Sequence, residues 1–192
     1  MAEHREGPVR SEAAHAAILQ ATVRLVQDRG YDRLTIEGIA TEAGVGKQTI
    51  YRWWPSKAAL VADCLLGGLL LKDRFELPST GNLRDDLITW VSSIFELLGT
   101  PQGEMLMRSL IAAATENAEV GLRLYESLGT DSSLTGRLQA AIDASELRHD
   151  APLDEMREAL VGAVILRALS RLPAGDGVAE RLVDLVLGTA AN

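Results

Sequence analysis

The chain has 192 residues, of which 47% are hydrophobic and 4% aromatic, so it can bury a sizeable core built mainly from aliphatic side chains. It contains no apolar run of the roughly 20 residues that a membrane span needs. The net charge is −8, yet residues 1–60 carry 8 basic and 7 acidic side chains against 11 and 20 in the rest, so a polyanionic partner would meet the N-terminal part.

The first residues are charged and lack an apolar signal region, so we expect a cytoplasmic protein. The single cysteine, Cys64, cannot form an internal disulfide, and its apolar surroundings favour a buried structural thiol over a redox sensor. His4, His15 and His149 are too dispersed to predict a metal site. The sequence shows no nucleophile motif, phosphate loop or paired carboxylates, so we expect neither a catalytic site nor a cofactor.

Helix-period patterns dominate the N-terminal part, and no segment is convincing as a strand. A first helix covers about 11–29 and stops at Gly30. A second is capped by Thr35 and ends at Gly44, and a short third covers about 47–54. Ser56 is expected to cap a long fourth helix that runs to about residue 75.

The stretch 76–82 gathers Pro, Ser, Thr, Gly and Asn and is the strongest candidate boundary in the chain. Beyond it, helical patterns cover 83–99, 101–129, 132–147, 153–172 and 177–190. The sequence therefore predicts an all-α protein without internal repeats.

The third helix has two distinct faces when it is projected at 100° per residue. Ile50 and Trp54 fall together on the inward side, and Gln48, Thr49 and Arg52 fall on the opposite arc. Tyr51 and Trp53 lie on the flanks, where an aromatic ring can cover the surface while its polar tip points outward. Taken alone, the polar arc of this helix is also compatible with a solvated face over a core Ile and Trp.

The preceding helix and glycine turn favour a helix-turn-helix. Ala40 suits a close helix crossing, and Gly44 suits a left-handed turn residue. The third helix would then enter the major groove, where Gln48 can pair with adenine and Lys47 and Arg52 can reach guanine or phosphate. We expect the DNA contacts to come from eight residues: Thr35, Lys47, Gln48, Thr49, Tyr51, Arg52, Trp53 and Lys57.

The stretch "LTIEGIATEAGVGKQTIYRWWPSKAALV", residues 34–61, resembles the DNA-binding domain of the TetR family of bacterial transcriptional regulators. The likeness covers roughly residues 10–65. Gly46 stands where the family more often has Ser or Thr, while Gln48, Arg52 and Trp53 also depart from the common pattern, so the operator sequence cannot be borrowed from a relative.

The resemblance implies a three-helix DNA-binding domain with a short N-terminal arm at 1–56, and a helical effector-binding and dimerisation domain at 57–192 joined to it by the long helix. It implies a homodimer on a palindromic DNA operator, released when a small, mostly apolar effector moves the fourth helix. A Met or aromatic side chain at helical spacing is more often plain core, but seven residues are candidates for the pocket: Phe75, Trp90, Phe95, Met105, Met107, Arg108 and Tyr125. A surface ion pair with Glu104 is the alternative for Arg108.

The last two helical patterns predict a dimer interface. Residues 160–169 leave no polar face, and a helix that is apolar all round needs covering on all sides. Two such helices from each chain suit a four-helix bundle across a two-fold axis, although a single-chain core is the simpler alternative. The candidate interface residues are Leu160, Val164, Ile165, Leu166, Leu169, Leu182, Leu185 and Val186.

Three functions are compatible with these observations. A ligand-responsive repressor is favoured; a DNA-binding regulator controlled by a protein partner, and a helical enzyme or scaffold that only mimics the N-terminal motif, are the alternatives. The polar tips of the Lys47–Arg52 face, next to two aromatic side chains, argue against the enzyme or scaffold.

Overall fold

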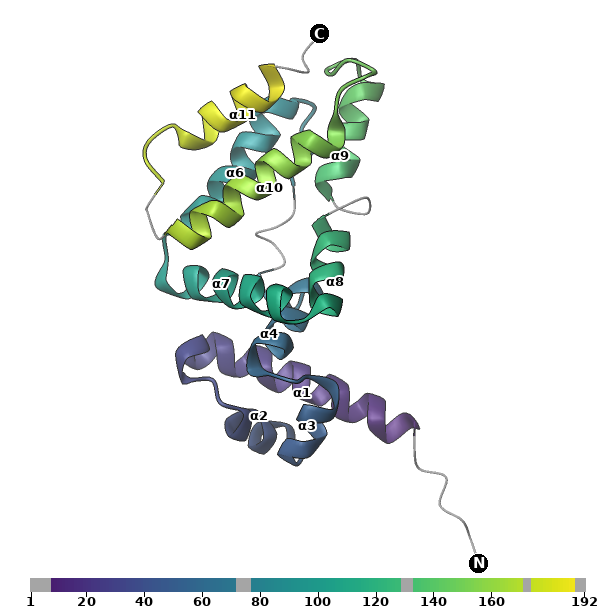
Figure 1. Ribbon diagram of the computed structural model, residues 1–192, viewed down its shortest axis with the longest axis vertical. Coiled ribbons are helices and arrows are strands. Elements are labelled where there is room, and N and C mark those ends of the chain that lie inside the picture. Colours follow the sequence, from purple (N-terminus) through teal and green to yellow (C-terminus); the bar gives the residue numbers. More distant parts are fainter. Residues whose placement is uncertain (1–7, 72–76, 129–132, 171–173, 189–192) are drawn as a thin grey trace, which may run out of the picture. The chain divides into compact units, whose positions relative to one another are not determined.

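A computed structural model of the chain describes residues 8–71, 77–128, 133–170 and 174–188. Every secondary-structure element in these ranges is a helix, which confirms the predicted all-α class (Figure 1). The chain divides into two compact units, one ending at Leu70 and the other beginning at Leu71. None of the described helices is long and apolar enough to cross a bilayer.

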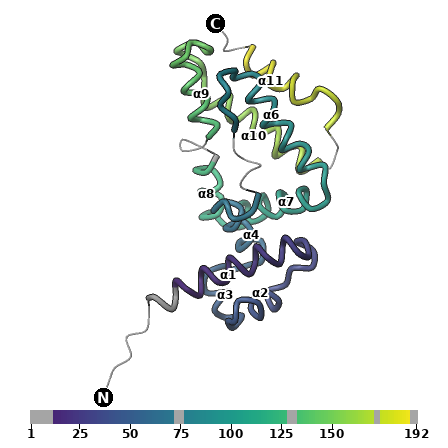
Figure 2. The backbone as a smooth tube through the Cα atoms, turned by 180° about the vertical axis from the view of Figure 1, so that it is seen from behind, coloured from purple at the N-terminus to yellow at the C-terminus, as the bar shows by residue number. Residues whose placement is uncertain are grey.

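The first unit packs its helices around α1. Figures 1 and 2 show α2 and α3 side by side against it. Its elements are α1 (Pro8–Arg29), the 3-10 turn η1 (Tyr31–Arg33), α2 (Ile36–Ala43), α3 (Lys47–Trp53) and α4 (Lys57–Leu66). Its interior is aliphatic, with fully buried side chains at Ile18, Val26, Ile39, Ile50 and Leu60.

Two capping side chains and one glycine turn fix where these short helices begin and end. Thr35 Oγ1 accepts a hydrogen bond from the Gly38 amide at 3.0 Å, so it caps α2 as predicted. Gly44 adopts a left-handed backbone at φ 68°, which a residue with a Cβ would rarely take, and this ends α2. Ser56 Oγ accepts from the Ala59 amide at 3.1 Å and starts α4.

The fourth helix is shorter than predicted. It ends at Leu66, where Gly67 and Gly68 follow in succession and Gly68 adopts φ 66°. Each glycine costs about 1 kcal/mol relative to alanine inside a helix, so the pair outweighs the apolar pattern that continues beyond it. The α4 helix packs against α1 and falls within the first unit, whereas the sequence placed it at the start of the second domain.

The second unit is arranged around α6, which packs against α7, α9, α10 and α11 (Figure 1). Its helices are α6 (Leu83–Leu98), α7 (Pro101–Glu116), α8 (Ala118–Leu128), α9 (Ser133–Asp143), α10 (Leu153–Ser170) and α11 (Val178–Gly188). The core consists mainly of aliphatic side chains, with Leu87, Ile94, Leu106, Leu138 and Leu160 almost fully buried.

The segment 101–129, expected as one helical run, is divided into α7 and α8 by Asn117. The Asn117 side-chain oxygen accepts a hydrogen bond from the Glu119 amide at 2.9 Å. Asparagine competes for backbone donors in this way, which makes it a frequent first residue of a helix and a poor interior one. The periodicity on either side of Asn117 carried no sign of this break.

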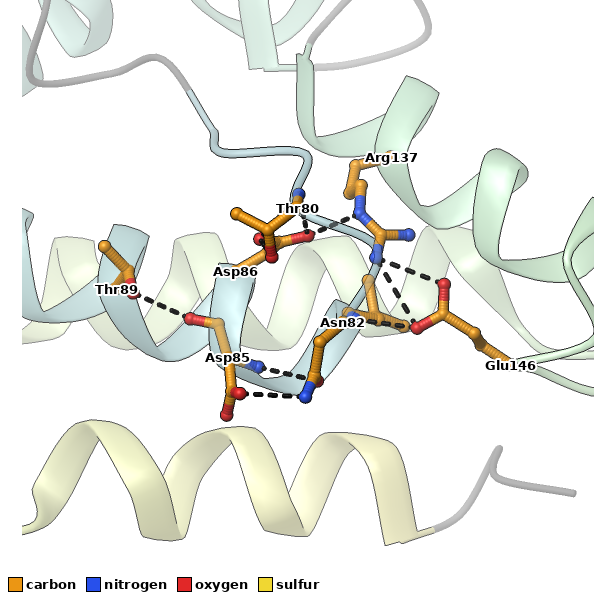
Figure 3. A network of polar contacts seen from close by, with 8 residues as sticks. Thr80, Asn82, Asp85, Asp86, Thr89, Arg137 and Glu146 are labelled. Atoms are coloured by element: carbon orange, nitrogen blue, oxygen red, sulfur yellow. Dashed lines mark hydrogen bonds and ion pairs between the residues drawn. The ribbon is translucent and has the colours of Figure 1, made fainter.

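A buried charge network ties α9 to the start of α6 (Figure 3). Arg137 on α9 is 6% exposed, and its Nε donates to Asp86 Oδ2 at 2.8 Å. Its Nη2 lies 3.1 Å from Glu146 Oε1, while the other oxygen of Glu146 accepts from the Leu83 amide at 2.7 Å. Thr80 donates to Asp86 through both its amide and its hydroxyl, at 3.1 and 2.7 Å. The network therefore holds residues that are distant in the sequence in one place.

Opposing effects set the ionisation of Asp86. Burial by itself raises the pKa of this carboxyl, but hydrogen bonds from Thr80 and Arg137 together outweigh burial and hold the pKa below its ordinary value. Asp86 is therefore charged at neutral pH although it is 1% exposed.

The surroundings of Cys64, in contrast, disfavour its charged form. Its side chain is 0% exposed, and burial, with a smaller contribution from Asp63, raises the pKa of the thiol to about 12. The thiol therefore stays protonated, as the apolar sequence around it indicates.

We expect Arg137→Met to lower the free energy of unfolding by about 3 kcal/mol, because it leaves the buried Asp86 carboxylate without its cation. Urea denaturation followed by circular dichroism measures the loss. Arg84→Met is the matched control, since Arg84 pairs with Asp184 at 2.7 Å while both side chains are about half exposed. A loss no greater than that of the control would contradict a stabilising role for the buried network.

The stability difference between the wild type and Arg137→Met is also expected to depend on pH. The folded-state pKa of Asp86 lies below its unfolded value, so its contribution is fully present above the unfolded pKa and is lost as pH falls through the folded pKa. The stability difference between wild type and Arg137→Met should therefore be constant near neutral pH and shrink below about pH 4. Denaturation curves at several pH values test this, and a difference that grows on acidification would be the opposite of our expectation.

Candidate nucleic-acid interface

The α3 helix separates an inward face from an outward face as predicted. Ile50 is 0% exposed and Trp54, at the end of the helix, is 5% exposed, so these two side chains attach α3 to the unit. Gln48 and Arg52 are exposed and Thr49 is half-buried. A helix of only seven residues thus presents most of its polar side chains to solvent and keeps its register through two apolar ones.

The flanking aromatic side chains of α3 are exposed to a degree that is uncommon for their type. Tyr51 is 52% and Trp53 41% exposed, and the Arg52 guanidinium lies 5.7 Å from the centroid of the Trp53 ring. These side chains combine an apolar surface with a hydrogen-bond donor at the tip. Next to Gln48 and Lys47, they form a surface able to donate to phosphates and to base edges.

The end of α3 is held by a cluster of ring contacts that its helical pattern does not predict. The His15 ring from α1 stacks on Trp54 at 4.7 Å between centroids and meets Trp53 edge-on at 4.8 Å. Trp54 Nε1 donates to Asp63 Oδ2 on α4 at 2.9 Å. The α1 and α4 helices thus fix the orientation of α3. The position of His15, three residues before the buried Ile18, is the sequence signal that could have indicated this contact.

Lys57, expected at a phosphate, is placed differently by the structure. Its Nζ donates to the carbonyl oxygens of Leu34 at 3.1 Å and Tyr31 at 3.3 Å and lies 4.1 Å from the centroid of the Tyr31 ring. An ammonium group has three donors, and two of them are used within the unit. Lys57 therefore secures the turn before α2.

Thr35 caps α2 and Lys47 is the first residue of α3. The side chain of each has a hydrogen-bond partner within the helix-turn-helix. Thr35 is exposed at the start of α2, where its hydroxyl caps the helix. Lys47 is the first residue of α3, and its Nζ donates to Glu37 Oε1 at 2.9 Å. Glu37 was not among the residues singled out from the sequence, because nothing in a helical projection shows which side chains of neighbouring helices meet.

The candidate effector residues occupy different environments in α6, α7 and α8. Trp90, Phe95 and Met107 are buried, while Met105 is half-buried and Tyr125 is 62% exposed. Arg108 is half-buried and pairs with Glu104 at 3.3 Å, the alternative considered for it. Phe75 lies outside the described residues.

The candidate interface residues also divide into two groups. Leu160, Val164 and Val186 are buried within the chain, and Ile165 and Leu182 are half-buried. Leu166, Leu169 and Leu185 are 67%, 53% and 70% exposed. The inward packing of α10 and α11 against α6 accounts for the first group, whereas the three leucines remain more than half exposed among the described residues.

No group of three or more His, Cys, Asp or Glu side chains that could hold a metal ion occurs in the part of the chain that the structure describes. The arrangement on α3 is one of hydrogen-bond donors and aromatic surfaces, which suits recognition rather than bond making.

Two family descriptions match the two units. Residues 18–64 match the bacterial regulatory proteins of the tetR family, and residues 77–186 match the tetracyclin repressor-like C-terminal domain.

Full-length relatives and solved structures agree with these matches. The chain is 33% identical over 174 residues to an uncharacterized HTH-type transcriptional regulator of Mycobacterium bovis, covering 88% of this chain and 84% of that protein. It is 31% identical over 192 residues to an uncharacterized HTH-type regulator of Bacillus subtilis, covering 96% and 92%.

The crystal structure of the TetR family transcription regulator SCO0332 is 30% identical, with a TM-score of 0.73 and coverage of 91% and 97%. A putative TetR-family regulator from Mesorhizobium loti, 20% identical with a TM-score of 0.57 and coverage of 96% and 100%, shares the fold. Transcription regulators of this kind bind DNA and are not enzymes. The two family matches together cover the helix-turn-helix and the helical second unit. The chain belongs to the TetR family of bacterial DNA-binding transcriptional regulators.

Proposed function

We propose that this regulator is a ligand-responsive repressor that binds a palindromic operator as a homodimer and is released by a small, mostly apolar effector. The observation that carries the DNA-binding part is the outward face of α3, where exposed Gln48, Tyr51 and Arg52 project from a helix fixed by buried Ile50 and Trp54. A helix of this kind enters the major groove with its N-terminal residues nearest to the base edges.

The contacts divide into two kinds. Gln48 has the donor and acceptor pair that adenine N6 and N7 require, so it is assigned a base contact. Tyr51, Arg52 and Trp53 carry donors beside apolar surfaces and are assigned to the phosphates on either side of the groove. The amide groups at the start of α2, next to Thr35, are a further donor set for a phosphate.

The exposed leucines support a dimer through α10 and α11. On α10, Gly162, Leu166 and Leu169 follow at intervals of four and three residues, so they share one face of the helix. Gly162 is exposed, and a Cβ built on it would meet no atom within 4 Å, so a partner helix can approach closely there. Leu185 adds an exposed apolar side chain on the neighbouring α11. A second copy that presents the same face would cover all three leucines.

Buried side chains of α6 and α7 support the effector part of the proposal. Trp90, Phe95 and Met107 on α6 and α7 offer apolar and polarisable surface that suits an apolar ligand. By linkage, an effector that lowers the affinity for DNA must itself bind more weakly to the DNA complex. The alternative is a regulator controlled by a protein partner, for which the exposed Leu122 and Tyr125 on α8 are a candidate surface.

The DNA contacts are tested with two substitutions. We expect Tyr51→Ala to weaken binding to all duplexes alike, because it removes a phosphate contact, and Gln48→Ala to relax the preference at one base pair by about 1–3 kcal/mol. Fluorescence anisotropy measures both, with a duplex from the upstream region of the gene and a scrambled duplex over a salt series.

Gln27→Ala, an exposed position on α1, is the control and should leave both affinities unchanged. If Tyr51→Ala and Gln48→Ala also bind as the wild type does, α3 is not the recognition helix. The complex of the wild-type protein with its duplex also serves as an assay for apolar compounds that release the DNA.

The dimer is tested with Leu166→Glu. A charge in the centre of the exposed apolar stripe should prevent association and produce monomers, because burying an unpaired carboxylate is strongly unfavourable. Light scattering coupled to size-exclusion chromatography measures the mass. Leu122→Glu, which alters a 57% exposed leucine on α8, should keep the mass of the wild type. A dimeric Leu166→Glu protein would show that the interface lies elsewhere.

A further inference from the structure

An ion pair links the first turns of the two helices of the helix-turn-helix. Glu37, the second residue of α2, accepts a hydrogen bond through Oε1 from Lys47 Nζ at 2.9 Å. Lys47 is the first residue of α3. The two side chains are 66% and 53% exposed, so the pair lies on the surface of the unit and not in its core.

Both partners are charged at neutral pH. The hydrogen bond from Lys47 lowers the pKa of the Glu37 carboxyl, and the same bond raises the pKa of the Lys47 ammonium. The pair therefore has no net charge, at a position where the neighbouring side chains would face a polyanion. An acidic side chain there reduces the affinity for any DNA, whatever its sequence.

Because the lysine side chain is flexible, an ion pair can decide which part of the DNA its ammonium group contacts. A lysine ammonium is a compact charge on a flexible four-carbon stem, and it can reach several phosphates equally well. A lysine that contacts phosphate adds affinity without discriminating between sequences. The N-terminal residues of a recognition helix lie nearest to the base edges, where guanine presents two acceptors, so a lysine that is kept from the phosphates at this position has a base within reach.

We propose that Glu37 is a specificity-determining positioning residue, which holds Lys47 Nζ at the base edge of a guanine and away from the phosphates. This inference rests on the proposed entry of α3 into the major groove. The Glu37 carboxylate lowers the affinity for any DNA, and by positioning Lys47 it raises the ratio of specific to non-specific affinity.

The chain contains a matched control on the same helix. Glu42 on α2 accepts from Arg24 Nε on α1 at 3.0 Å, and the two side chains are 42% and 51% exposed. Glu37→Gln and Glu42→Gln therefore remove the same charge, from the same helix, out of an exposed ion pair of similar length. Only the first pair involves the recognition helix.

The experiment begins with a randomised duplex pool, from which the wild-type protein selects its preferred duplex. Dissociation constants for that duplex and for a scrambled one of equal length are then measured over a salt series for the wild type and both variants. We expect Glu37→Gln to bind the scrambled duplex about 3- to 10-fold more tightly, with a salt slope steeper by about 0.9, as one added phosphate contact requires. The ratio of specific to non-specific affinity should fall about 10-fold, as the loss of one base contact requires. Glu42→Gln should keep the wild-type ratio.

Lys47→Ala shows whether Glu37 acts through the lysine. In that background, the further change Glu37→Gln should leave the affinity ratio unaltered, and a further fall would overturn the positioning role. The inference also fails if Glu37→Gln and Glu42→Gln change the ratio equally. A wild type that selects no sequence from the pool would instead contradict the proposed function itself, so the two failures can be distinguished.

Discussion

Seven residues are too few for a helix to hold itself together in water, so α3 depends on the burial of Ile50 and Trp54. Trp54 connects α3 to both neighbouring helices, because its ring packs on His15 from α1 while its indole N–H donates to Asp63 on α4. Two longer helices thus fix the rotation of α3 about its own axis. That rotation decides which side chains point outward, and a rotation of one residue would bring Ile50 to the surface.

The first unit also depends on where its individual charges are placed. The first unit ends at Leu70 and carries 8 basic and 8 acidic side chains, so it cannot attract DNA by bulk charge. Lys57 is used within the unit at the carbonyls of Tyr31 and Leu34, and Lys47 is paired with Glu37. In the function proposed above, pairing these two lysines within the unit lowers the general affinity for DNA, because it reduces the counterion release that they can contribute.

The second unit shows how an apolar helix divides its surface between two tasks. Residues 160–169 of α10 are largely apolar, and the structure uses Leu160 and Val164 for the core against α6 while Leu166 and Leu169 remain exposed. Burying every one of these leucines within one chain would require more helices than the described part of this unit supplies. The buried network of Arg137, Asp86 and Glu146 fixes α9 against α6 at a cost in desolvation that only complete pairing offsets.

The sequence by itself determined the helical class, the inward face of α3, the cap at Thr35 and the left-handed turn at Gly44. These features depend on residues close together in the chain, so periodicity and capping preferences are enough to predict them. The tertiary structure decided the contacts between helices: His15 on Trp54, Lys47 on Glu37, Lys57 on backbone carbonyls and Arg137 on Asp86. It also decided which leucines of α10 are buried, because that choice depends on where neighbouring helices lie and not on the order of residues within one of them.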